Sequence, residues 1–137
     1  MKNTCCVPIL FILLAALGSS PAHAIDVGVA HAVYATPEKT YLEINIEIAA
    51  ASVTFKRVDS IHLQAGVETL ILIKQGEKVV TFEKYRLSSP LVGYPQDLLD
   101  VKRLFVPAGE YQLEITFQDI HDANNTQSYA SPLRIDL

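Results

Sequence analysis

Alternating apolar and polar positions recur along the chain and predict β-strands. The cleanest example covers residues 42–48, where Leu42 and three isoleucines alternate with polar residues. Residues 106–119, VPAGEYQLEITFQD, repeat the pattern after a turn at 107–109. A period of two places one set of side chains against a core and the other set in water. Both segments therefore predict strands with one buried face.

Shorter segments predict the remaining strands. We expect them at residues 27–35, 51–57, 61–67, 70–73, 80–87, 101–106 and 129–137. The phase of apolar residues changes near Glu83-Lys84, which predicts a β-bulge there. One helical turn is expected at 97–100 and a polar loop at 119–127. About eight short strands without a convincing helix predict an all-β fold, an immunoglobulin-like antiparallel β-sandwich, with a small closed barrel as the alternative.

Two residues of the late strand are expected to have structural roles. Gly109 ends the Pro107-Ala108-Gly109 turn, and we expect it to take a positive φ. Tyr111 follows directly. It is either a tyrosine corner, whose hydroxyl fixes the preceding loop, or a core tyrosine.

The first 24 residues have the pattern of a secretory signal peptide. Lys2 precedes an apolar run at 7–17, and Ala22-His23-Ala24 fits a cleavage site for leader peptidase. The run is too short for a transmembrane helix. We therefore expect a signal peptide at 1–24, a β-sandwich domain at 25–137 with no membrane span, and a secreted or periplasmic location.

Composition argues against several classes of function. Both cysteines, Cys5 and Cys6, lie in the signal peptide, so the exported domain has neither a disulfide nor a thiolate nucleophile. The net charge is −4, and no basic cluster exceeds two adjacent residues, which argues against nucleic acid as a partner. No G-x-S-x-G serine or glycine-rich phosphate loop is present. We expect a protein that is not an enzyme and needs no cofactor.

A calcium site is a weak candidate in the polar segment 119–127. Asp119, Asp122 and Asn124 supply oxygen atoms, which calcium prefers, but their spacing lacks the rhythm of a calcium loop. Aspartate and asparagine also occupy turns for backbone reasons alone.

The final strand is the candidate interaction edge. Pro132 cannot donate a ladder hydrogen bond, so this strand is expected at a sheet edge or with a bulge. We expect it to pair or dock with a partner protein or a second copy of the chain. The edge residues are Tyr129, Pro132, Leu133, Ile135 and Leu137.

Three strings carry a family resemblance: SVTFK at 52–56, VVTFEKYRLSSP at 79–90 and FVPAGEYQLEI at 105–115. Their order and spacing resemble the N-terminal β-sandwich region of the exported GWxTD-domain proteins of Bacteroidetes and relatives. The chain has no tryptophan, so it lacks the motif that names the family. The resemblance implies an envelope location and an interaction or structural role, in either a truncated or a free-standing family member. The rival is a small-ligand carrier or an uncharacterised enzyme on the same frame.

Overall fold

The computed structural model describes residues 24–136, so the predicted signal peptide, apart from Ala24, and Leu137 lie outside the described residues. Nine strands and one short 3₁₀ helix make up this part of the chain. They are β1 (Val27–Ala35), β2 (Thr40–Ile48), η1 (Ala50–Ser52), β3 (Lys56–Arg57), β4 (Leu63–Gln64), β5 (Gly66–Gln75), β6 (Lys78–Ser88), β7 (Leu98–Phe105), β8 (Gly109–Asp119) and β9 (Asp122–Ile135).

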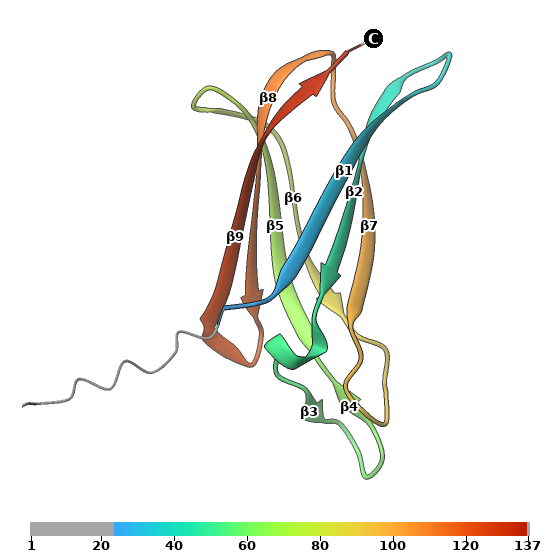
Figure 1. The fold of residues 1–137 in the computed structure, drawn as a ribbon, viewed down its shortest axis with the longest axis vertical. Helices are drawn as coiled ribbons and strands as arrows, with labels where there is room; N and C mark the ends of the chain where they lie inside the picture. Colours follow the sequence, from blue (N-terminus) through green and yellow to red (C-terminus); the bar gives the residue numbers. More distant parts are fainter. Residues whose placement is uncertain (1–23, 137) are drawn as a thin grey trace, which may run out of the picture.

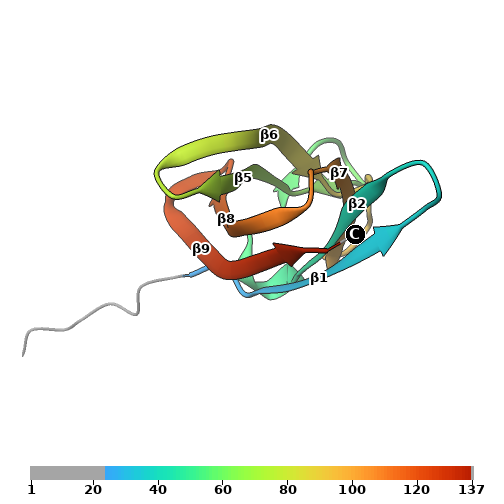
Figure 2. The ribbon, with the colours of Figure 1, turned by 90° about the horizontal axis from the view of Figure 1, so that it is seen from above.

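Two antiparallel sheets face each other (Figures 1 and 2). One has three strands in the order β1-β2-β7, and the other has four in the order β6-β5-β8-β9. Strands β3 and β4 form a small separate hairpin at the lower end in Figure 1. A three-stranded and a four-stranded sheet with crossing connections form an immunoglobulin-like sandwich, so the predicted all-β class is confirmed.

The core lies between the two sheets and runs from Ile25 to Ile135. Its fully buried side chains come from alternate positions of the central strands, as the period of two predicts. Leu42, Ile44 and Ile48 extend from β2, and Leu113 and Ile115 from β8, all without exposed surface. Within the described part of the chain, all nine strands and this core therefore lie between Ile25 and Ile135.

Tyr111 has the geometry of a tyrosine corner at the start of β8. Its hydroxyl donates a hydrogen bond to the carbonyl oxygen of Pro107 at 3.0 Å, four residues upstream. Gly109 has φ of 156°, and a Cβ atom there would lie 3.1–3.2 Å from the Tyr111 ring and hydroxyl. Glycine at position 109 therefore permits both the turn and the close approach of the Tyr111 ring.

Several predicted elements are corrected by the structure. Residues 51–57 form mainly a 3₁₀ turn and loop, because strand pairing there is limited to Lys56–Arg57. Ile61 is 68% exposed in a turn instead of facing the core. Residues 97–100 form no helical turn, since β7 begins at Leu98. The segment 119–127 is a tight β8–β9 connection, in which β9 already starts at Asp122.

The predicted bulge at Glu83-Lys84 is also wrong. Pairing of β5 with β6 is regular there, and the register shifts instead between Ile73 and Lys74, opposite Val80. Beyond this shift the phase of β6 is unbroken. Phe82 is 66% exposed as a result, whereas Tyr85 is partly buried against the core.

Candidate functional site

Two long connections meet at the lower end of the sandwich in Figure 1. We call residues 49–65 and 89–97 the loop end. The first connection joins β2 to β5 and contains η1, β3 and β4, and the second joins β6 to β7. Loops at the ends of a sandwich are common places for binding, because the sheets hold them in fixed positions.

The turn between β3 and β4 is held together by Asp59. One carboxylate oxygen accepts the backbone N–H groups of Ile61 and His62 at 2.9 and 2.8 Å, and the other lies 2.7 Å from Nδ1 of His62. The hydrogen bond from the His62 ring, followed by the one from Ile61 N–H, lowers the pKa of Asp59 to about 2. The Arg57 guanidinium donates to the carbonyl of Ser60 at 2.9 Å. The turn is therefore preorganised by its own side chains.

The second loop is hydrogen-bonded to the first. Backbone groups of Leu63 and Val92 exchange two hydrogen bonds, at 2.7 and 3.1 Å. Ser89, which is buried, accepts the N–H of Ala65 on its hydroxyl at 3.0 Å. Its carbonyl accepts the side-chain amide of Gln64 at 2.9 Å. The two loops consequently form one structural unit.

This unit exposes four large apolar side chains to solvent. Val58 and Ile61 come from the first loop and Leu91 and Tyr94 from the second, with 55%, 68%, 51% and 68% of their surface exposed. The exposure of Ile61 was not predicted, because the alternating pattern assigned this residue to a strand facing the core. The Asp59-Ser60 pair is a turn signal, and in the structure this turn extends to His62, because Asp59 accepts the N–H groups of Ile61 and His62.

The predicted calcium residues are not assembled into a site. Asp119 is 1% exposed, and its carboxylate accepts the backbone N–H groups of Thr54 at 2.8 Å and His121 at 2.9 Å. Asp122 accepts the N–H of Asn124 at 3.1 Å, and both residues are exposed. Within residues 24–136 no group of three or more acidic, histidine or cysteine side chains could hold a metal ion.

Asp119 instead anchors the loop end to the β8–β9 hairpin. Burial acts to raise the pKa of its carboxyl, but the N–H donors of His121 and Thr54 outweigh burial and hold the pKa below its ordinary value. Asn125, also buried, donates its side-chain amide to the carbonyl of Ser52 at 2.8 Å. Asp119 and Asn125 therefore fix the start of the first loop, whereas Asp122 bonds locally to Asn124.

The predicted interaction edge is only partly available. Strand β9 does lie at the edge of the four-stranded sheet, and within residues 24–136 it pairs with β8 alone. Leu133 and Ile135, however, are 3% and 1% exposed and belong to the core, so their side chains are not available for docking. Tyr129 packs partly against the core and Pro132 is exposed, while Leu137 lies outside the described residues.

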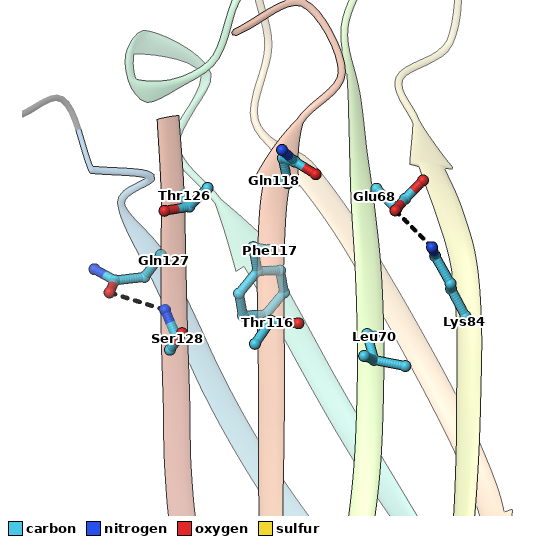
Figure 3. Close-up of a pocket in the computed structure, with 9 residues that line it drawn as sticks. All are labelled: Glu68, Leu70, Lys84, Thr116, Phe117, Gln118, Thr126, Gln127 and Ser128. Atoms are coloured by element: carbon cyan, nitrogen blue, oxygen red, sulfur yellow. Dashed lines mark hydrogen bonds and ion pairs between the residues drawn. The ribbon is translucent and has the colours of Figure 1, made fainter. Parts of the chain in front are cut away.

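A hollow of about 310 Å³ lies on the outer face of the four-stranded sheet (Figure 3). Glu68 and Lys84 form an ion pair of 2.9 Å on one side of it. The hydroxyl groups of Thr116, Thr126 and Ser128 lie on the β8 and β9 side. Such a surface offers hydrogen bonds to a small molecule.

Charged residues also face inward where β6 and β7 approach each other. The Tyr85 hydroxyl donates to the Asp100 carboxylate at 2.6 Å, and Lys102 lies 3.8 Å from the centre of the Tyr85 ring. Lys102 also pairs with Glu83 at 3.1 Å. Burial, and then the bond to Asp100, raises the pKa of Tyr85. This network closes one side of the sandwich and keeps the phenol protonated.

Comparison with known proteins leaves the family unassigned. No family model matches the chain, and no curated protein matches it. One similar solved structure is that of an ApaA-like protein from Bordetella pertussis, at 12% sequence identity and a TM-score of 0.40. The likeness covers 82% of this chain and 94% of that one. A likeness this distant does not assign a function. Among residues 24–136, no helix has the length and hydrophobicity to cross a membrane.

Proposed function

We propose that this chain is an exported, non-catalytic interaction module that binds a protein partner through its loop end. The observation that carries the proposal is the group of four exposed apolar side chains on two hydrogen-bonded loops. Apolar side chains gathered on a surface are typical of interaction sites. Loops that are already ordered lose little conformational entropy when a partner binds.

The state of the ionisable groups supports a binding role over catalysis. Asp59 and Asp119 accept backbone hydrogen bonds, and Tyr85 donates to Asp100. Each group therefore has an evident structural task within the fold.

Export is part of the proposal and has a separate test. The charged start, apolar run and A-x-A site of residues 1–24 support secretion or a periplasmic location. The resemblance to GWxTD-domain proteins supports an envelope role. Intact mass of the exported protein is expected to place Ile25 at its N-terminus. A neighbouring gene that encodes a Gly-Trp-x-Thr-Asp motif would support the family proposal.

The binding test compares two substitutions at equally exposed apolar residues. Residues 25–137 are immobilised and incubated with an envelope extract of the native cells, and the retained proteins are quantified by mass spectrometry. Ile61→Asp is expected to lose a partner that the wild type retains. Phe82→Asp, on the outer face of the four-stranded sheet and 66% exposed, is expected to keep it. Equal retention by both variants and the wild type would contradict a binding role for the loop end.

The hollow in Figure 3 favours a second candidate, a carrier of small polar molecules. Its test is a thermal-shift screen with sugars and amino acids. A ligand that stabilises the wild type but not a Thr116→Val, Ser128→Ala double variant would support the carrier. Stabilisation that persists in this variant would place the ligand elsewhere.

A further inference from the structure

The outer face of the three-stranded sheet exposes several large apolar side chains to solvent. Leu99, Val101 and Phe105 of β7 point away from the core and are 71%, 52% and 61% exposed. Neighbours on this face form four cross-strand rows. The rows are Gly28–Glu47–Leu99, Ala30–Asn45–Val101, Ala32–Glu43–Arg103 and Tyr34–Tyr41–Phe105.

Strand β7 reverses the usual polarity of a surface strand. Asp100 and Lys102 share the inward face with buried Leu98, while Leu99 and Val101 face outward. A strand that has solvent on one side normally alternates in the opposite sense. The reversal places apolar side chains where a second surface can cover them.

On β1, the outward side chains increase in size from Gly28 through Ala30 and Ala32 to Tyr34. At the end near Gly28, a shallow hollow of about 410 Å³ is lined by Gly28, Ala30, Leu99 and Val101. A Cβ atom at Gly28 would have only the Glu47 carbonyl within 4.0 Å, so the space above it is open. The opposite end is filled by aromatic rings. Tyr34 and Tyr41 stack with centroids 5.4 Å apart, and Phe105 lies beside them in the same row.

Charge is graded in the same direction. Glu47, in the row with the hollow, has no ion-pair partner within 4.0 Å among the described residues. Lys39, beside the aromatic row, lies 4.2 Å from the centre of the Phe105 ring and likewise has no carboxylate partner in that part of the chain. One end of the face thus has a free carboxylate and a hollow, and the other a free ammonium group and bulky rings.

From these features we propose that the face binds a second copy of the chain. In the dimer, a two-fold axis runs along the rows, so that the aromatic row of one copy covers the glycine row of the other. Tyr34 then lies over Gly28, Phe105 over Leu99, and Lys39 near Glu47, each contact occurring twice as an isologous interface requires. A two-fold axis along the strands would instead oppose Glu47 to Glu47 and hollow to hollow. Size and charge therefore favour the first arrangement.

The dimer is expected to be weak. Three strands about 4.8 Å apart and eight or nine residues long at about 3.3 Å per residue give a face on the order of 400 Å². Two such faces bury about 800 Å², less than the roughly 1,200–2,000 Å² of stable interfaces. We therefore expect reversible association, with a dissociation constant on the order of tens to hundreds of micromolar.

The first experiment measures the oligomeric state of residues 25–137 by sedimentation velocity from about 10 µM to about 1 mM. The wild type is expected to shift from monomer to dimer with concentration. Leu99→Asp is expected to raise the dissociation constant at least about tenfold, and Ile61→Asp, at an equally exposed apolar residue of the loop end, to leave it unchanged. A wild type that stays monomeric throughout, or association lost in Ile61→Asp and kept in Leu99→Asp, would overturn the proposal. Circular dichroism verifies that each variant is folded.

The second experiment tests the direction of stacking by charge exchange. Glu47→Lys and Lys39→Glu are each expected to weaken self-association, because each places like charges at both symmetric contacts. Mixing the two variants is expected to restore association, since every contact then joins a lysine to a glutamate. Weakening without restoration on mixing would exclude the proposed arrangement. Neither variant alters the loop end, so this result is independent of partner binding there.

Discussion

Removing the Asp119 side chain tests whether this buried carboxylate anchors the loop end. In Asp119→Ala, the N–H groups of Thr54 and His121 lose their acceptor in a partly buried position. Each buried donor without a partner costs about 1–3 kcal/mol, and because the two hydrogen bonds are only partly buried we expect a total of about 2–4 kcal/mol. For a domain of this size, each kcal/mol of lost stability lowers the Tm by about 3–5 °C.

Urea unfolding of residues 25–137, followed by far-ultraviolet circular dichroism, measures this loss. The matched control is Asp122→Ala in the same hairpin, whose exposed carboxylate makes only a local bond, and its cost is expected to be within about 0.5 kcal/mol. Equal costs for the two variants would refute the anchoring role. Calcium is expected to leave the Tm of the wild type unchanged, because backbone N–H groups already occupy the Asp119 oxygens.

The lowered pKa of Asp119 also predicts how the stabilities of the wild type and of Asp119→Ala depend on pH. A carboxyl whose folded-state pKa lies below its unfolded value adds stability above the unfolded pKa, about 4, and loses it as the pH falls through the folded pKa. Asp119→Ala is therefore expected to be less sensitive to acid than the wild type as the pH falls below about 4.

The remaining predictions concern the core and the turn before β8. Tyr85→Phe is expected to cost about 1.5–3 kcal/mol, because it removes a hydrogen bond to a charged group. Since the raised pKa of Tyr85 adds stability that is lost above the unfolded value of about 10, the variant is also expected to lose less stability in alkali. Gly109→Ala is expected to cost about 1 kcal/mol or more in urea unfolding, and a Tyr111→Phe background should reduce that cost if the two residues act together. Leu113→Ala is expected to cost about 2–5 kcal/mol in the same assay through cavity formation.

The buried face of a strand could be predicted from the sequence where only one of its two alternating sets of positions is apolar. In β2 and β8 the apolar residues share one face, so alternation alone identifies what is buried. In β6 both phases contain apolar residues, and the sequence alone could not decide between Phe82 and Tyr85. Tyr85 faces inward because Asp100 and Lys102 of the opposing sheet bind it, a contact between strands distant in sequence.

The functional residues were harder to predict for a similar reason. Asp119 and Asp122 look alike in a polar segment, yet Asp119 is buried because the first loop passes over it and donates the Thr54 N–H. The exposed patch at Ile61 depends on the pairing of Leu63 with Val92 across two loops. Local patterns do not encode such pairings, whereas they do encode the face that a strand buries.

The inward charges of β7 bear on the proposed self-association. Inward-pointing charged residues on an edge strand discourage the addition of another strand. Asp100 and Lys102 occupy such positions on β7, and both are engaged by residues of β6. Edge pairing at β7 would bury these charged side chains further, while stacking on its outer face would leave their surroundings unchanged. The same alternation that protects the edge also turns Leu99 and Val101 outward. Association through the face of the three-stranded sheet, with the loop end free for another protein, is therefore the arrangement that this strand favours.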